Sequence, residues 1–243
     1  MRKGIVISLL ACLLVSLCAC VRENAAPSAL EFQDISWNSS PEEVFEKLGL
    51  DMETMERGAV ETGSVSDHFY ITVAGWDVFG EKALTAYFRF DNYCPETSDY
   101  FGLSAVQIFY PEDCDKEAIL AKVRDQYGPE AREYTLYSIV DGKPEERRYI
   151  QKEGSSCWFS QRLVGDALSD QGKQAYRRAL GSISDEGFEA CLAAPAARIE
   201  WTADYYGQFA DMEHIIPEDG HVARLSISGG SLALVLQEFE NPQ

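Results

Sequence analysis

The sequence from Ala83 to Tyr110 reads ALTAYFRFDNYCPETSDYFGLSAVQIFY. Its two ends, Ala83–Asn92 and Leu103–Tyr110, are rich in aromatic and β-branched residues, and a polar segment separates them. Such runs are typical of β-strands, and a polar connection between neighbouring runs is typical of an antiparallel hairpin. We therefore expect these two strands to pair as a hairpin of an antiparallel sheet.

Further strands are predicted on both sides of this hairpin. Tyr134–Val140 and Arg147–Gln151 flank Asp141-Gly142, a favoured hairpin turn. In the last predicted hairpin, apolar and polar residues alternate from Ala223 to Ser228, Gly229-Gly230 makes the turn, and Leu232, Leu234 and Leu236 return on one face. The remaining predicted strands are His68–Ala74, Ser155–Val164 and Arg198–Asp204.

Four helices have clear start and stop signals. The first begins with the capping box Ser40-Pro41-Glu42-Glu43 and ends at Gly49. The second begins at Asp113 to Asp115, carries an apolar face that ends with Tyr127, and stops at Gly128-Pro129. The third runs from a Ser169 cap to Gly181, and the fourth starts at Ser184 or Asp185 and ends before Pro195.

These elements predict an α+β fold with a largely antiparallel sheet or sheets and about four helices packed on one side. A boundary near Gly128–Arg132 would divide the body into two similar α+β sub-domains, 30–130 and 131–243. One continuous domain, 30–243, is the alternative, since a body of this size can bury a large core as a single unit.

The N-terminal residues predict export. Arg2 and Lys3 precede an apolar run of 16 residues, Gly4–Ala19, and the chain becomes polar at Arg22. A charged start, a short apolar middle and a small residue before the cleavage point are typical of a signal peptide. The run is shorter than the roughly 20 residues of a membrane-spanning helix. An uncleaved membrane anchor and an ordinary signal peptide cut after Ala19 are the alternatives.

The end of this run, Leu17-Cys18-Ala19-Cys20, resembles the lipobox of bacterial lipoproteins. The resemblance implies that the signal peptide, residues 1–19, is cut off before Cys20 and that the Cys20 sulfur receives a diacylglyceryl group. Two acyl chains give lasting membrane attachment, whereas one does not. Residues 20–29 are then the anchor and tether, and the protein faces the extracytoplasmic side of a bacterial cell membrane.

A second resemblance covers Asp34–Val44 and Leu48-Gly49. This segment looks like the opening of many small bacterial envelope lipoproteins, among them the outer-membrane assembly lipoproteins of the β-lactamase-inhibitor-protein-like fold. The resemblance implies a binding module rather than an enzyme. The greater length and the later helices of this chain differ from that pattern, so no functional residue is transferred.

The composition restricts the partners. The 243 residues carry a net charge of −19. Loss of residues 1–19 removes Arg2 and Lys3, so 19 basic residues remain against 40 acidic ones and the net charge becomes −21. Nucleic acid is excluded as a partner, because its binding depends mainly on lysine and arginine. We expect the lipid on Cys20 to hold the protein at the membrane, and an envelope protein or a ligand to be its partner.

Cys94, Cys114, Cys157 and Cys191 follow the anchor. Export permits disulfides, and an even number is compatible with two, although four free thiols remain an alternative. A Cys94–Cys114 bridge is disfavoured, because eight strand residues would separate the two cysteines by about 26 Å at about 3.3 Å per residue, against a limit near 7 Å.

The best candidate for chemistry is Asp211–His221, which holds two histidines and four carboxylates within 11 residues. Imidazole and carboxylate groups suit divalent metals. However, Pro217 and Gly220 break the segment, and its spacing matches neither the His-Glu-x-x-His helix nor the calcium loop. A solvated acidic turn is the other interpretation.

Two aromatic groups and one histidine complete the candidates. The loop Asp91–Phe101 could stack its tyrosines on a sugar or a partner, although we expect it to cover the sheet edge. Trp201, Tyr205, Tyr206 and Phe209 have spacings that suit one helix face packed in the core, and His68 is expected to be structural.

No nucleophile elbow, penicillin-enzyme motif, phosphate-binding loop or dinucleotide fingerprint occurs in the sequence. We therefore assign no catalytic, metal-ligating or cofactor-binding residue. The sequence predicts a lipid-anchored lipoprotein that acts as a non-catalytic binding or envelope-assembly module. A metal-dependent cell-surface hydrolase that uses Asp211–His221 and a solute-binding lipoprotein of a transporter are the alternatives.

Overall fold

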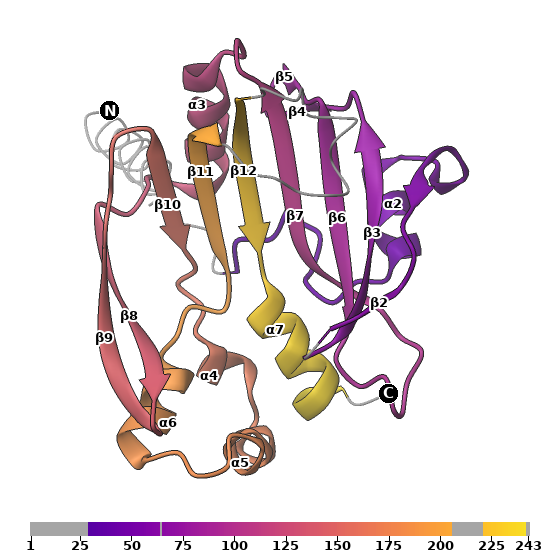
Figure 1. The fold of residues 1–243 in the computed structure, drawn as a ribbon. Coiled ribbons are helices and arrows are strands. Elements are labelled where there is room, and N and C mark those ends of the chain that lie inside the picture. The colour runs from indigo at the N-terminus through magenta and orange to yellow at the C-terminus, as the bar shows by residue number, and fades with distance from the viewer. Residues whose placement is uncertain (1–28, 64, 206–220, 242–243) are drawn as a thin grey trace, which may run out of the picture.

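The computed structural model describes residues 29–63, 65–205 and 221–241 (Figure 1). The main sheet has eight strands in the order β1-β3-β6-β7-β12-β11-β10, and β2 also pairs with β3. All of these pairs are antiparallel. The strands are β1 (Glu56–Arg57), β2 (Glu61–Thr62), β3 (Asp67–Ala74), β6 (Thr85–Asn92), β7 (Gly102–Pro111), β10 (Ser155–Phe159), β11 (Arg198–Tyr205) and β12 (Val222–Ser228). The α+β prediction with a largely antiparallel sheet is confirmed.

The hairpin predicted between Ala83 and Tyr110 is present as β6 and β7. Thr85 pairs with Phe109 at the open end and Asp91 with Gly102 near the connecting loop. A bulge between Arg89 and Phe90 shifts the register. Because side chains alternate between the two faces of a strand, Ala86, Phe88 and Phe90 point to one side, and Thr85, Tyr87, Arg89 and Asp91 point to the other.

The prediction of a second strand at Leu232–Leu236 is wrong. Strand β12 pairs with β7 on one side and with β11 on the other, so no edge is free for a returning strand. The chain instead forms α7 (Gly230–Val235), which continues into a π-helical turn, η3 (Leu236–Glu240). The change of direction occurs at Gly229, where the Trp37 indole lies so close that a Cβ would stand 2.0 Å from its Cδ2 atom.

The four predicted helices are confirmed. Side chains cap three of them as expected, Ser40, Ser169 and Ser184, and Asp115 caps the fourth. Ser40 and Glu43 form the reciprocal capping box, and Gly49 ends that helix in the left-handed region. The bounds are α2 (Pro41–Leu48), α3 (Lys116–Tyr127), α5 (Asp170–Ala179) and α6 (Asp185–Leu192), and the structure adds α4 (Val164–Ala167) and a 3-10 turn, η1 (Met52–Thr54).

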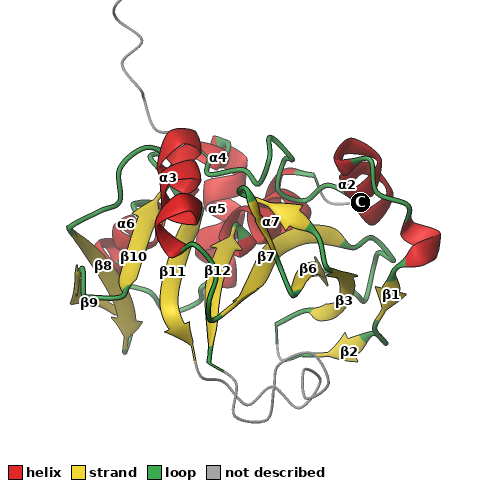
Figure 2. Cartoon of the chain, turned by 90° about the horizontal axis from the view of Figure 1, so that it is seen from above, coloured by secondary structure: helices red, strands yellow, loops and turns green. Residues whose placement is uncertain are grey.

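The helices lie on one side of the main sheet (Figure 2). The main core fills the space between the sheet and α2, α3 and the C-terminal helix, whereas a separate apolar cluster joins α4, α5 and α6 to that helix. The N-terminal segment Leu30–Trp37 and Phe45 of α2 contribute to the main core, and so does Tyr127 of α3. From the sheet come Phe69, Ile71, Phe88, Phe90, Val106, Ile108, Ile199, Trp201, Leu225 and Ile227. We call this side of the sheet the helix face and the other side the open face.

Two small hairpins stand outside the main sheet. One is β4 (Asp77–Val78) with β5 (Glu81–Lys82), and the other is the longer ribbon of β8 (Glu133–Val140) and β9 (Lys143–Ile150). The ribbon turns at Asp141-Gly142 as predicted. Phe159 of β10 stacks on Tyr134 of the ribbon, with ring centroids 4.1 Å apart, and Ser184 donates its backbone N–H to the Gly142 carbonyl. The ribbon is therefore fixed at both ends.

The main sheet contains strands from both of the ranges considered as sub-domains. Its centre is the pairing of β7 (from residues 30–130) with β12 (from residues 131–243), which runs from Val222–Pro111 to Ser228–Ala105. The core likewise combines side chains of both ranges. No helix in the described part of the chain is long and apolar enough to cross a bilayer.

Candidate functional site

The two faces of the main sheet differ in chemistry. The helix face is apolar, as the core residues show. The open face carries a small aromatic cluster around Tyr87 and Phe109, and beside it a polar region. Its side chains come from alternate positions of the central strands: Tyr70 on β3, Thr85, Tyr87, Arg89 and Asp91 on β6, Gln107 and Phe109 on β7, Arg224 and Ser226 on β12, and Glu200 on β11.

Asp91 is a buried carboxylate at one end of this face. It is 1% exposed. The Arg89 Nε and Nη2 atoms each donate to it over 2.9 Å, and the hydroxyls of Ser66 and Ser104 also donate to it. We call these four residues the Asp91 cluster. Both carboxylate oxygens are thereby occupied.

The ionisation of the Asp91 cluster is fixed by these bonds. Burial opposes the charged form of Asp91, but the hydrogen bonds from Arg89, Ser104 and Ser66 outweigh it, and the pKa of Asp91 is lowered. Burial also opposes the charge of Arg89. The hydrogen bonds to Asp91 and its negative charge outweigh this effect, so the pKa of Arg89 is raised. Asp91 and Arg89 therefore both stay charged, and the two carboxylate oxygens of Asp91 already accept hydrogen bonds. This arrangement suits a structural ion pair better than a general base.

Gln237 links the Asp91 cluster to the C-terminal helix. Its Nε2 atom donates to the Asp91 carbonyl over 3.0 Å and to Asn38 Oδ1 over 2.6 Å. Its Oε1 atom accepts from the Tyr93 backbone N–H over 2.9 Å. Segments from the two ends and the middle of the described chain are therefore held at one point.

The loop Asp91–Phe101 covers this end of the sheet. Tyr100 donates its hydroxyl proton to the Asn38 carbonyl, and the Phe101 ring packs against Phe69 with centroids 5.0 Å apart. Asn92 closes the loop by donating to the Ser98 carbonyl. These contacts favour the covering role over a platform for sugars.

A grid of six residues lies further along the open face, where β6, β7 and β12 are adjacent. Thr85, Phe109 and Arg224 form one row across the three strands, and Tyr87, Gln107 and Ser226 form the next. The Tyr87 and Phe109 rings meet edge to face at 5.8 Å. The Arg224 guanidinium carbon lies 4.0 Å from the centre of the Tyr205 ring. We call these six residues the grid.

Three polar atoms of the grid are buried without a hydrogen-bond partner: Thr85 Oγ1, Gln107 Oε1 and Arg224 Nε. A fourth, His68 Nδ1, belongs to the same face of β3. Buried polar atoms in folded proteins are nearly always paired with protein or water, and an unmet one costs about 1–3 kcal/mol. Within the described part of the main sheet, the grid therefore holds most of the buried polar atoms that lack a partner.

His68 lies near the start of β3, between β2 and β6. It is opposite Glu61 on one side and Asp91 on the other. Its Nε2 atom is 3.6 Å from a Glu61 carboxylate oxygen, and its ring meets Tyr70 edge to face.

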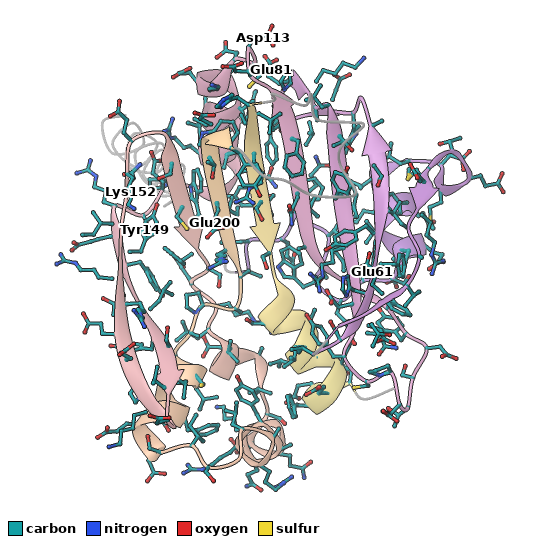
Figure 3. The ribbon with its side chains drawn as sticks, in the orientation of Figure 1. Glu61, Glu81, Asp113, Tyr149, Lys152 and Glu200 are labelled. Atoms are coloured by element: carbon teal, nitrogen blue, oxygen red, sulfur yellow. The ribbon has the colours of Figure 1, made fainter. Side chains whose placement is uncertain are left out.

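The four cysteines of the body are free in the structure. Cys157 is buried on β10, and burial followed by the nearby Glu200 charge raises the pKa of its thiol to about 12. Glu200 lies on the part of the sheet next to the β8–β9 ribbon, on the same side of the molecule as Tyr149 and Lys152 and far from Glu61 (Figure 3). A thiol so protonated is a poor nucleophile.

The metal candidate Asp211–His221 lies outside the described residues except for His221. Its Nδ1 atom is 2.5 Å from an Asp204 carboxylate oxygen. Among the residues that the structure describes, no group of three or more histidines, cysteines or carboxylates could hold a metal ion.

The helix-face interpretation of Trp201 and Tyr205 is wrong. Both residues lie on β11, where Trp201 is buried in the core. A register shift between Thr202 and Tyr205 turns Tyr205 to the open face, where it packs with Phe109. The other two members of this aromatic group, Tyr206 and Phe209, are outside the described residues.

Two cavities flank Phe159 beside the ribbon. One, of about 270 Å³, lies between Leu136, the segment Ala194–Arg198 and the start of α7. The other, of about 310 Å³, lies between Tyr127, Tyr134 and Trp158. Arg198, Ser228 and Ser231 supply the polar side chains of the first cavity, and Gln161 belongs to the lining of the second.

The sequence analysis did not find the grid. Thr85, Gln107 and Arg224 each interrupt an apolar strand, which is the normal pattern of a solvated sheet face. Only the pairing of three strands distant in sequence places them together.

No protein family model, no curated protein sequence and no solved structure matches this chain.

Proposed function

We propose that this protein is a lipid-anchored bacterial lipoprotein on the extracytoplasmic side of the membrane, and that its α+β body is a non-catalytic binding module. The observation that carries the proposal is the sequence Leu17-Cys18-Ala19-Cys20 at the end of a 16-residue apolar run. The open face supports the binding role, because it combines aromatic rings with polar atoms that have no partner.

The position of the first described residues agrees with such an anchor. The Ala29 carbonyl accepts a hydrogen bond from Trp37 Nε1 over 3.1 Å, and the Glu31 carbonyl accepts one from the Tyr127 hydroxyl over 3.1 Å. These contacts place the start of the body on the helix side of the sheet. Nine residues connect Cys20 to Ala29 and span at most about 30 Å at about 3.5 Å each.

Electrostatics supports a body that stands off the bilayer. The processed chain has a net charge of −21, and the surface of a membrane rich in anionic lipids is itself negative. Repulsion leaves the lipid on Cys20 as the attachment and keeps the binding face in water.

Intact-mass measurement on protein extracted from membranes tests the anchor. We expect a chain that begins at Cys20 and carries the mass of a diacylglyceryl group. Cys20→Ala removes the modified sulfur and should leave an unprocessed chain, whereas the matched control Cys18→Ala keeps it and should be processed normally. A wild-type chain that retains Met1, or one that begins at residue 20 without lipid, would refute the proposal.

A further inference from the structure

The cavity of about 270 Å³ beside Phe159 combines apolar walls with a positive charge. The walls come from Leu136, Phe159 and the segment Ala194–Ala197. Arg198 is the only charged side chain among the described lining residues, although the chain carries 40 acidic residues against 21 basic ones. We call this space the Arg198 cavity. Its single charge favours a ligand that is negative at one end and apolar at the other.

The register of three strands places the polar groups of the Arg198 cavity in one row. Phe159 of β10 is opposite Arg198 of β11, and Arg198 is opposite Ser228 of β12. Directly opposite side chains share one face of a sheet, with Cβ atoms about 4.5–5.5 Å apart. Ser231 of α7 adds a second hydroxyl to the lining. One ligand can therefore meet a ring, a guanidinium and hydroxyl donors.

Arg198 is accessible to a ligand. Its side chain is 52% exposed, and its Nε atom lies 3.5 Å from the Glu200 Oε1 atom. This separation exceeds the about 2.7–2.9 Å of a charge-assisted hydrogen bond, and exposed ion pairs of this kind are weak. The guanidinium therefore keeps N–H groups for a carboxylate that enters the cavity, and its planar fork can hold both carboxylate oxygens.

The apolar walls of the Arg198 cavity are held in place from two directions. On the sheet side, the Ala197 backbone N–H donates to Ser160 Oγ over 3.2 Å. On the other side, Leu136 belongs to the β8–β9 ribbon, which the stacking of Tyr134 on Phe159 attaches to β10. The walls therefore need little ordering when a ligand enters, which lowers the entropic cost of binding.

We propose that the Arg198 cavity binds a small monocarboxylic acid with a short aliphatic or aromatic body. Arg198 holds the carboxylate, and the hydroxyls of Ser228 and Ser231 donate to it. The body of the ligand lies against Leu136 and Phe159. An amine would be repelled by Arg198, and inorganic phosphate would leave the apolar walls in water. The volume of about 270 Å³ lies just below the about 300–1,000 Å³ of typical ligand pockets, which restricts the ligand to a small one.

Isothermal titration calorimetry on the full mature protein in detergent tests this proposal. The probes are benzoate and the straight-chain carboxylates from acetate to hexanoate, which are short enough to stay in water. Hexan-1-ol and hexylamine lack the carboxylate, and inorganic phosphate lacks the apolar body. We expect hexanoate and benzoate to bind in a saturable way, with an affinity that rises about four-fold per methylene from acetate to hexanoate. The alcohol, the amine and phosphate should not bind.

Substitutions at exposed positions assign the binding to the Arg198 cavity. Arg198→Gln removes the charge, and we expect at least about ten-fold weaker binding of hexanoate. Ser231→Leu places an apolar side chain at the lining from an exposed position, so it should also weaken binding. Glu200→Gln removes the carboxylate that competes for Arg198 and should strengthen binding. The matched control Arg148→Gln removes an exposed positive charge outside the lining and should bind as the wild type does.

The proposal fails if none of the carboxylates binds, or if hexan-1-ol or hexylamine binds as tightly as hexanoate, because the charge of Arg198 then selects nothing. It also fails if hexanoate binds equally well to Arg198→Gln and Ser231→Leu, because the ligand then lies elsewhere. The inference rests on the proposed binding role. The mass measurement on Cys20 tests the anchor and not the cavity, so the two proposals are judged separately.

Discussion

The two faces of the main sheet illustrate two ways of using the same strands. Phe88 and Phe109 are both fully buried on the paired strands β6 and β7. Phe88 points to the helix face, where rings from Phe32, Phe45 and Trp76 surround it. Phe109 points to the open face, where its neighbours include polar atoms without partners. One face is optimised for stability, whereas the other retains groups that a stable core would not contain.

The largest effect is expected on the helix face. Phe88→Ala removes a ring that the helix side encloses completely, and such a cavity costs about 3–5 kcal/mol of unfolding free energy. Urea unfolding of the full chain measures the loss. Val65→Ala, at a side chain that is 66% exposed, should change the same quantity by less than about 0.5 kcal/mol. A loss below about 1 kcal/mol for Phe88→Ala would contradict the distinction between the faces.

The Asp91 cluster is the exception on the open face, because its polar groups are fully paired. Asp91→Ala leaves Arg89 and two serines without their acceptor, and we expect a loss of about 3 kcal/mol, since breaking a buried ion pair costs about 3–5 kcal/mol and Arg89 keeps some contact with solvent. The matched control is Glu145→Ala, which removes the exposed partner of Arg147 and should cost less than about 0.5 kcal/mol. Equal losses would show that the cluster is not structural.

The pH dependence of stability separates the charge of Asp91 from its packing. The folded pKa of Asp91 is lowered below its usual value, so its contribution is complete above the unfolded pKa of about 3.9 and is lost as the pH falls through the lower folded pKa. The stability difference between wild type and Asp91→Asn should therefore shrink as the pH falls below about 4. Urea unfolding at a series of pH values measures it. A difference that is constant over this range would contradict the assignment.

The smallest effect concerns two serines of the same sheet. Ser104 donates its hydroxyl proton to Asp91, and Ser104→Ala should cost about 1–2 kcal/mol. Ser226, in the grid, is partly exposed, and Ser226→Ala should change stability by less than about 0.5 kcal/mol. The reverse order would mean that the grid, and not the Asp91 cluster, is the paired part of the open face.

Local signals in the sequence were enough for most of the secondary structure. The Ser40 capping box, the Ser169 and Ser184 caps and the Asp141-Gly142 turn act within a few residues, and the structure contains each of them. The failure at Leu232–Leu236 had a non-local cause. Gly229-Gly230 and alternating leucines are compatible with a hairpin, but β7 and β11 already occupy both edges of β12.

The same reasoning explains why the grid could not be predicted. Thr85, Gln107 and Arg224 are separated by up to 139 positions, and each alone resembles an ordinary solvated strand residue. The side to which Tyr205 points depends on a bulge after Thr202, which alternation in the sequence does not reveal. The resemblance to a lipobox, by contrast, rests on four consecutive residues, Leu17 to Cys20.

The place of β12 in the sheet has a consequence for folding. It is the last strand of the described chain, yet it lies between β7 and β11 and joins the two parts of the sheet. The earlier strands can form hairpins among themselves, but the sheet cannot close until residues 222–228 are available. A chain emerging from a ribosome or passing through a translocation channel must therefore release almost its whole length before it can reach the native state, and contacts of such long range form slowly.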